Sequence, residues 1–179
     1  MRPIELTLQG LHSFKNRQTV DFSKLLDAGV FGIFGPTGAG KSTILDAVTL
    51  ALYGSVERAP NKTTGILNQS SESVEVSLIF ELGQGIQRRR YKVERVYKRK
   101  AEFNLENKIS RLSEISGTDD SAKVIADKQG DVNTHVAKII GLSMEDFTRA
   151  VVLPQGKFAE FLKLVGAERN KMLQRLFNL

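Results

Sequence analysis

A short glycine-rich motif constrains this sequence more than any other feature. The pattern G-x-x-x-x-G-K-[ST] is matched by Gly35, Gly40, Lys41 and Ser42. In such a loop, glycines let the backbone curl so that successive N–H groups point at phosphate oxygens. The lysine reaches the terminal phosphates, and the serine hydroxyl binds Mg²⁺. The motif therefore predicts a P-loop that binds a nucleoside triphosphate together with Mg²⁺.

The candidate site residues follow from this motif. Those expected to contact the nucleotide form one continuous run: Gly35, Pro36, Thr37, Gly38, Ala39, Gly40, Lys41, Ser42 and Thr43. Lys41 is also the catalytic candidate of the loop, because its charge would bridge the phosphates during transfer. Ser42 is the candidate metal ligand.

The surroundings of the motif support this interpretation. Residues 30–34 are almost wholly apolar and predict a buried central strand that runs directly into the loop. After Lys41, apolar residues recur at helical spacing up to Leu52, and Gly54 stands where a helix would end. Strand, loop and helix in this order are the context that a P-loop requires.

The rest of the chain alternates between strand and helix patterns. Strands are expected at residues 4–8, 19–22, 74–80 and 91–97, the last two forming a hairpin, with a meander continuing to about Ile115. A turn is expected at 117–120. Helices are expected at 132–140, 158–164 and 167–178, and a further short helix is expected to begin at a capping box formed by Ser143 and Asp146. We predict an α/β fold with a mixed sheet, an antiparallel meander and a C-terminal helical segment.

Length and composition set outer limits. A chain of 179 residues fits one domain, here residues 1–179, and its 41% hydrophobic content is ordinary for a globular protein. No apolar run is long enough for a membrane span, and the absence of cysteine excludes disulfides and thiolate metal sites. We expect a cytoplasmic, nucleoid-associated protein. The last helical stretch, about 157–179, has no stop signal and is expected to be the root of a longer coiled coil.

Positive charge is concentrated in one segment. Residues 88–100 hold eight Lys or Arg and one Glu, which leaves 18 basic and 19 acidic residues for the rest of the chain. A local basic stripe suits phosphate-backbone contact without sequence readout. The candidate DNA contacts are Arg88, Arg89, Arg90, Lys92, Arg95 and Lys98. A solvated hairpin explains the same pattern equally well.

Other P-loop classes fit less well. A GTPase would carry Asn-Lys-x-Asp, but the pairs Asn61-Lys62 and Asn107-Lys108 are not followed by that aspartate. A small nucleotide kinase would place its arginine cluster between helices, whereas residues 88–90 lie in a strand pattern.

The machinery for hydrolysis is also incomplete in this sequence. An apolar strand ending in a catalytic acid is missing, and we interpret Glu81, the nearest candidate, as a surface charge at a strand end. A Ser-Gly-Gly signature does not occur either. The chain therefore holds a phosphate-binding loop without the groups that complete an ATPase.

Three stretches carry a family resemblance: residues 6–14, residues 35–47 and, above all, residues 147–158. Together they resemble the N-terminal ATPase lobe of the SbcC family, bacterial SMC-like DNA-repair ATPases with an ABC-type head. The likeness covers essentially the whole chain. It implies that the signature motif, the catalytic acid and a switch histidine belong to a C-terminal lobe beyond a long coiled coil.

The resemblance also implies a mechanism. Two ATP molecules lie between two heads, and head closure remodels a partner nuclease, SbcD, that processes double-stranded DNA ends and hairpins. Gln155 matches the family glutamine that meets Mg²⁺ and the attacking water, so it is a catalytic and metal candidate. His12 and Ser13 match nucleotide-contacting positions, although many relatives carry arginine at the first. For Asp46 we favour a buried salt bridge over a role beside the Mg²⁺ site.

Two competing interpretations remain open at this point. One is an SMC-like ATPase that clamps DNA without a nuclease partner. The other is a self-contained nucleotide kinase. Phosphoryl transfer by the isolated chain would favour the kinase, and co-purification with a manganese-dependent nuclease would favour the SbcC-like protein.

Overall fold

The computed structural model describes residues 1–28, 32–100, 104–116, 121–150, 165–166 and 174. Within them the chain forms six strands: β1 (Arg2–Gln9), β2 (Gln18–Asp21), β3 (Ser73–Leu82), β4 (Arg89–Arg99), β5 (Leu105–Ser116) and β6 (Ser121–Ala126). The α-helices are α1 (Lys41–Tyr53), α2 (Gln129–Ile140) and α3 (Met144–Ala150). Short 3₁₀ turns occupy η1 (Ser23–Ala28), η2 (Pro60–Lys62) and η3 (Gly85–Gln87).

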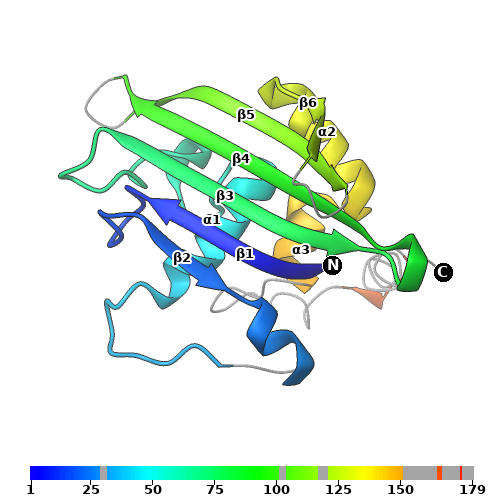
Figure 1. The fold of residues 1–179 in the computed structure, drawn as a ribbon. Helices are drawn as coiled ribbons and strands as arrows, with labels where there is room; N and C mark the ends of the chain where they lie inside the picture. The colour runs from blue at the N-terminus through cyan, green and yellow to red at the C-terminus, as the bar shows by residue number, and fades with distance from the viewer. Residues whose placement is uncertain (29–31, 101–103, 117–120, 151–164, 167–173, 175–179) are drawn as a thin grey trace.

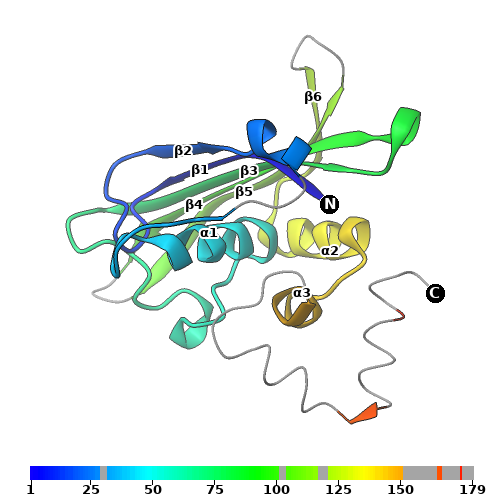
Figure 2. The same cartoon turned by 90° about the horizontal axis from the view of Figure 1, so that it is seen from below.

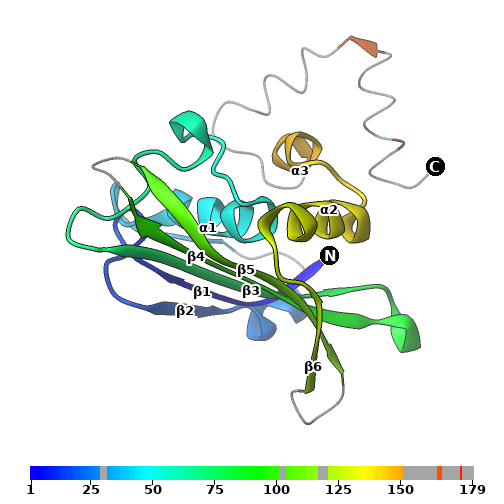
Figure 3. The ribbon, with the colours of Figure 1, turned by 90° about the horizontal axis from the view of Figure 1, so that it is seen from above.

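The strands build one antiparallel sheet in the order β2-β1-β3-β4-β5-β6 (Figure 1). Helices α1 and α2 lie against one face of this sheet, and α3 lies on the same side but further out, packed on α1, as the views along the sheet edge show (Figures 2 and 3). The core lies between that face and the helices. The α/β class is confirmed, and no helix in the described part of the chain is long and apolar enough to cross a membrane.

Side-chain alternation explains why the central hairpin forms. On β3, Val74, Val76, Leu78 and Phe80 are buried beneath the helices, while the residues between them face the other side of the sheet. The predicted hairpin is confirmed, with Phe80 opposite Tyr91 across the β3–β4 pair and their rings stacked at 5.6 Å. A period of two with one apolar face is what a half-covered antiparallel strand requires.

The predicted helix ends are also confirmed. Helix α1 ends at Gly54, which adopts a left-handed conformation and donates its N–H to the carbonyl of Leu50 at 2.9 Å. Helix α2 ends in the same way at Gly141. At the start of α3, the Asp146 N–H donates to the Ser143 hydroxyl oxygen at 3.1 Å, and that hydroxyl donates to the Asp146 carboxylate at 2.9 Å. Ser143 therefore caps the helix as predicted, with the Asp146 carboxylate on the Ser143 hydroxyl.

One expected strand does not form in the described residues. Residues 32–34, the described part of the segment before the P-loop, lie in no strand, and the Phe34 side chain is 92% exposed. A strand is stable only beside a hydrogen-bonding neighbour, and within the described sheet every pairing is antiparallel and excludes this segment. The parallel component of the predicted mixed sheet is therefore not found there.

One further difference concerns the second half of the chain, and several predictions there are not tested. Strand β6 pairs with β5 through residues such as Val124, which lies opposite Ser113, although the sequence analysis did not predict this strand. The turn expected at 117–120 and the helices expected at 158–164 and 167–178 fall on segments outside the described residues, apart from position 174.

Candidate nucleotide site

Glycines shape the loop between Gly35 and α1, and at Gly40 the surroundings leave no room for a side chain. Gly38 and Gly40 have φ values of 86° and 87°, in the left-handed region that side chains disfavour. Gly40 is also crowded, because a Cβ atom there would lie 2.6 Å from the Phe14 ring and 2.8 Å from the Ser13 hydroxyl. The loop can thus pass close beneath the turn that carries Ser13 only if residue 40 is glycine.

Lys41 lies across this loop. Its Nζ atom donates hydrogen bonds to the carbonyl oxygens of Gly35 and Pro36, both at 2.7 Å. The ammonium group is therefore held at the mouth of the loop, where the N-terminus of α1 adds its own partial positive charge. Positive charge from two sources converges on one point, which suits the terminal phosphates of a nucleotide.

A pocket of about 490 Å³ opens over the loop. Its size falls in the range of small-molecule and cofactor sites, about 300–1,000 Å³. The residues around it are His12, Ser13, Thr37, Gly38, Gly40, Lys41, Ser42, Thr43 and Arg58. Most of the residues predicted to contact the nucleotide are thus brought together. Gly35 and Pro36 contribute the carbonyls that hold Lys41, and Ala39 donates its N–H to Pro36 within the loop at 3.3 Å.

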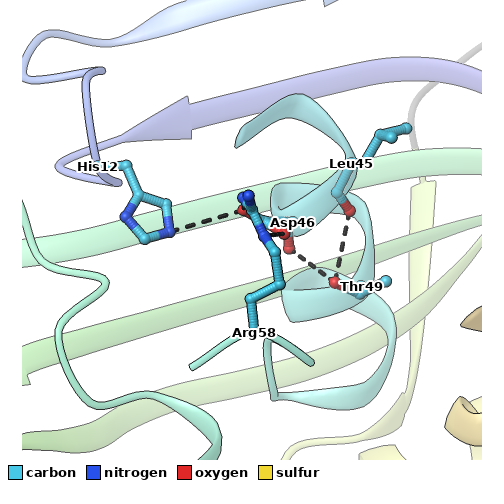
Figure 4. A network of polar contacts seen from close by, with 5 residues as sticks. All are labelled: His12, Leu45, Asp46, Thr49 and Arg58. Atoms are coloured by element: carbon cyan, nitrogen blue, oxygen red, sulfur yellow. Dashed lines mark hydrogen bonds and ion pairs between the residues drawn. The ribbon is translucent and has the colours of Figure 1, made fainter. Parts of the chain in front are cut away.

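His12 reaches this pocket from the end of β1 through a tight turn. Its φ of 48° is left-handed, and the turn is fixed because the His12 N–H donates to Ile66 at 2.8 Å and its carbonyl accepts from the Asn68 amide at 2.6 Å. The buried Nε2 atom has no hydrogen-bond partner among the described residues and lies 3.6 Å from the Asp46 carboxylate (Figure 4). Burial lowers the pKa of His12, Asp46 opposes this shift, and Arg58 adds to it.

The interpretation of Asp46 as a buried salt-bridge member is confirmed. Its side chain, on the second turn of α1, accepts from the Arg58 Nε atom at 3.2 Å and pairs with a second guanidinium nitrogen of Arg58 (Figure 4). Thr49 donates to the Asp46 carbonyl at 3.0 Å, one turn further along the helix. The carboxylate is thus committed to Arg58 and directed away from a role as a metal ligand.

Arg58 is the pocket residue that the sequence analysis missed. It follows α1 in a polar loop with the composition of an exposed connection, and its side chain is 53% exposed. The signal that could have revealed it is Asp46, because a carboxylate on a buried helix face needs a cationic partner nearby. Arg58 adds a second cation, a half-exposed guanidinium, to the pocket that Lys41 borders.

A magnesium ion fits the residues that are described. Ser42 stands in the first turn of α1 and borders the same pocket as Lys41. Mg²⁺ in phosphate sites is held mainly by phosphate oxygens and water, with one or two protein ligands, so a single hydroxyl is a suitable anchor. Consistently, no group of three His, Cys, Asp or Glu capable of holding a metal occurs in the described segments. Gln155, the other predicted ligand, lies outside them.

The basic segment lies on β4 and the hairpin before it, and much of its charge is paired. Glu81 pairs with Arg90 at 2.8 Å and with Arg88 at 3.6 Å, Arg89 lies 3.6 Å from Glu114, and Lys92 lies 2.7 Å from Glu94. Lys98 is exposed.

Two sequence-based interpretations of this region are wrong. Arg95 faces the helices and is 0% exposed, so it cannot contact DNA. Side chains of β4 alternate between the two faces of the sheet, and Arg95 lies on the same covered face as Tyr91, Val93 and Tyr97. Glu81 is only 8% exposed and is therefore not a surface charge. It is buried because β3 lies between two other strands, with Arg2 of β1 opposite Glu81 on one side and Arg90 of β4 opposite it on the other.

A glycine loop with a lysine at the start of a buried helix, opening into a pocket of nucleotide size, defines a P-loop nucleotide-binding domain. A family model described as an AAA domain matches residues 5–179, and the chain belongs to this family.

Named relatives agree with the resemblance noted in the sequence. The chain is 59% identical over 179 residues to the SbcC subunit of the SbcCD nuclease of Bacillus subtilis and 48% identical over 180 residues to that of Clostridium acetobutylicum. It is 36% identical over 181 residues to a probable DNA double-strand break repair Rad50 ATPase of Aquifex aeolicus. All three alignments cover 100% of this chain but only 16%, 15% and 17% of the relatives.

Proposed function

We propose that this chain is the N-terminal lobe of an ATPase head in an SbcC-like subunit. It binds ATP and Mg²⁺ at the loop and hydrolyses ATP only together with a C-terminal lobe and a second head. The observation that carries the proposal is the placement of Lys41 and Ser42 at the N-terminus of α1, on one pocket with the glycine loop. Gln155 would complete the site as the γ-phosphate sensor.

The chemistry of the pocket explains why a further lobe is needed. The described residues that border it include three basic or titratable side chains, Lys41, Arg58 and His12, and no carboxylate. The nearest acid, Asp46, is already paired with Arg58. Such a site can hold phosphates, and the groups that orient the attacking water would be Gln155 and an acid supplied by the C-terminal lobe.

We further propose that the head acts on double-stranded DNA ends with an SbcD nuclease, in the cytoplasm beside the chromosome. The hairpin residues Arg88, Arg89 and Arg90, with Lys92 and Lys98 on the same strand, would contact the phosphate backbone. Their partial pairing with acidic residues limits how much free charge the surface carries. Neutralising the three arginines should make the DNA affinity depend less steeply on salt concentration. An unchanged dependence would indicate that these arginines are solvated hairpin residues that do not contact DNA.

The proposal is tested by comparing the chain alone with the complete head. We expect the chain alone to bind Mg·ATP without measurable turnover. The complete head should hydrolyse ATP at a rate that rises more steeply than linearly with protein concentration, because two heads must meet. Phosphoryl transfer by the chain alone to a small acceptor would contradict the proposal and indicate a kinase.

The nuclease partnership needs a separate measurement. Full-length protein purified from cells should bring with it a manganese-dependent nuclease. Its reproducible absence, with ATPase activity and DNA binding intact, would instead indicate an SMC-like clamp that works without a nuclease.

A further inference from the structure

Arg95 is a charged side chain buried in the core, and every one of its guanidinium nitrogens is used. Its Nε atom donates to the Ala51 carbonyl at 2.7 Å, and one Nη2 hydrogen bond reaches the Leu52 carbonyl at 3.0 Å. Nη2 also donates to the Asn133 side-chain oxygen on α2 at 2.7 Å, and Nη1 donates to the Ser110 hydroxyl on β5 at 3.2 Å. Arg95 therefore joins α1, α2, β4 and β5 through one group.

The two carbonyls that Arg95 contacts belong to the last turn of α1. The final four carbonyls of a helix have no partner within the helix and must be satisfied from outside. Tyr97, two residues further along the same face of β4, donates its hydroxyl to the Gly54 carbonyl at 3.3 Å. Two neighbouring side chains of one strand thus cap the C-terminal end of the phosphate-binding helix.

The charge of Arg95 is balanced in an unusual way. The acceptors named above are all neutral, the neighbouring Tyr97 hydroxyl also interacts with the guanidinium, and among the described residues no carboxylate forms an ion pair with it. The C-terminal end of a helix carries a partial negative charge, so α1 itself supplies the compensation. Gly54 belongs to the same arrangement, because a Cβ atom there would lie 2.8 Å from the Arg95 Nη1 atom.

The hydrogen bonds of Arg95 can affect the nucleotide site at the other end of α1, because the helix moves as a single rigid element. The helix has 13 residues, so its ends lie about 20 Å apart at about 1.5 Å per residue. Apolar packing along its length holds the helix by shape, and this packing does not single out particular backbone groups. The hydrogen bonds from Arg95 to two carbonyls of the last turn instead fix where α1 lies along its own axis. A shift at the last turn would move Lys41 and Ser42 by the same amount.

We propose that Arg95 is a positioning residue for the nucleotide site, which sets where α1 presents the loop amides, Lys41 and Ser42. The inference rests on the proposed nucleotide binding at that loop. It assigns to Arg95 an effect on phosphate affinity beyond the one that a loss of folding stability alone would cause, since misplacement by about 1 Å in a preorganised site costs up to about 100-fold.

The test uses the full-length protein and measures Mg·ATP affinity beside thermal stability. Arg95→Lys keeps the charge but cannot reach both carbonyls from one planar group, and we expect it to weaken Mg·ATP binding by about tenfold or more. Leu112→Ala is the matched control, because Leu112 is equally buried and lies on β5, which packs against α2 and not mainly against α1, so its loss leaves a cavity while the hydrogen bonds at the end of α1 remain. At a temperature where both variants are folded, Leu112→Ala should bind Mg·ATP like the parent protein.

A milder variant keeps the test decisive if Arg95→Lys does not fold. Asn133→Ala removes one acceptor of Arg95 on α2, and it should weaken binding in the same direction but less. Unchanged affinity in both variants, or equal loss in Leu112→Ala, would overturn the proposal. Failure of the proposed function looks different: the parent protein itself would then bind Mg·ATP no better than Lys41→Met.

Discussion

The Nζ atom of Lys41 lies 2.7 Å from the carbonyl oxygen of Gly35, so the lysine spans the loop that it would share with a phosphate. Replacing it should remove charged hydrogen bonds to the terminal phosphates without disturbing the core. We expect Lys41→Met to weaken Mg·ATP binding by about 100-fold or more, measured by calorimetric titration. The melting temperature of the nucleotide-free protein should stay within about 2 °C of the parent.

Lys128→Met is the control for this change, because Lys128 is exposed at the start of α2, away from the pocket. Both variants lose one positive charge. If the two lost the same affinity, the effect would be one of net charge, and the role of Lys41 at the loop would be refuted.

Gly40 and Gly38 offer a comparison at nearly equal backbone strain. Their φ values are 87° and 86°, but only a Cβ at Gly40 would collide with the Phe14 ring and Ser13. Both alanine variants incur the strain of the left-handed conformation, about 1–2 kcal/mol. Gly40→Ala should in addition displace the loop from the Ser13 turn and lose Mg·ATP binding, whereas Gly38→Ala should retain most of it. Equal losses in the two titrations would mean that the close approach at Gly40 is unimportant.

His12 should make stability fall as pH falls. Burial keeps its folded-state pKa below the ordinary value of 6.5, so below pH 6.5 the unfolded chain binds a proton more readily than the folded protein. The stabilisation is present above pH 6.5 and is lost as the pH drops toward the folded-state pKa. Since the ring is about one-third exposed, we expect less than about 1 kcal/mol.

Denaturant unfolding at pH 7.5 and pH 5.5 measures this effect. His12→Asn is a suitable reference, because asparagine tolerates the left-handed backbone at this position. The parent should lose more stability between the two pH values than His12→Asn does. A parallel fall in both proteins would assign the pH dependence to other groups.

Glu81 restrains two of the arginines proposed to meet DNA. Its buried carboxylate pairs with Arg90 and Arg88, so Glu81→Gln should free both guanidinium groups. We expect DNA binding to tighten and its dependence on salt to steepen, at a cost of about 1–2 kcal/mol in stability. Fluorescence anisotropy with a blunt duplex over a salt series would show this.

Glu114→Gln is the matched variant for that experiment, because among the described residues Glu114 forms an ion pair with one of these arginines, Arg89. It should tighten DNA binding less than Glu81→Gln. If Glu81→Gln bound DNA no more tightly than the parent, the arginines would be structural ion-pair partners rather than DNA contacts.

The sequence predicted the local elements well because their signals are local. The glycine at each helix end, the Ser143/Asp146 cap and the alternation of the central hairpin each depend on a few neighbouring residues. The same alternation also places Arg95 on the covered face with Val93, whereas its charge favours exposure, so the two signals at this residue disagree. A buried arginine is recognisable only once the free carbonyls at the end of α1 are known to lie opposite it.

The remaining differences arise from partners distant in sequence. Residues 32–34 have strand composition, yet a strand needs a neighbour that the described sheet does not provide. Glu81 is buried because two flanking strands bring Arg2 and Arg90 to it. Arg58 enters the nucleotide pocket because Asp46 holds it there. None of these relationships is encoded in the spacing of adjacent residues.

The central claim is that the loop and the first turn of α1 bind the phosphates of a nucleotide. A crystal structure with Mg²⁺ and a non-hydrolysable ATP analogue tests it most directly. We predict that the phosphates lie on the backbone amides of Gly38, Gly40 and Lys41, with Mg²⁺ on the Ser42 hydroxyl and the Lys41 ammonium moved from the Gly35 carbonyl to phosphate. An analogue bound elsewhere, with Lys41 still on the Gly35 carbonyl, would contradict the account.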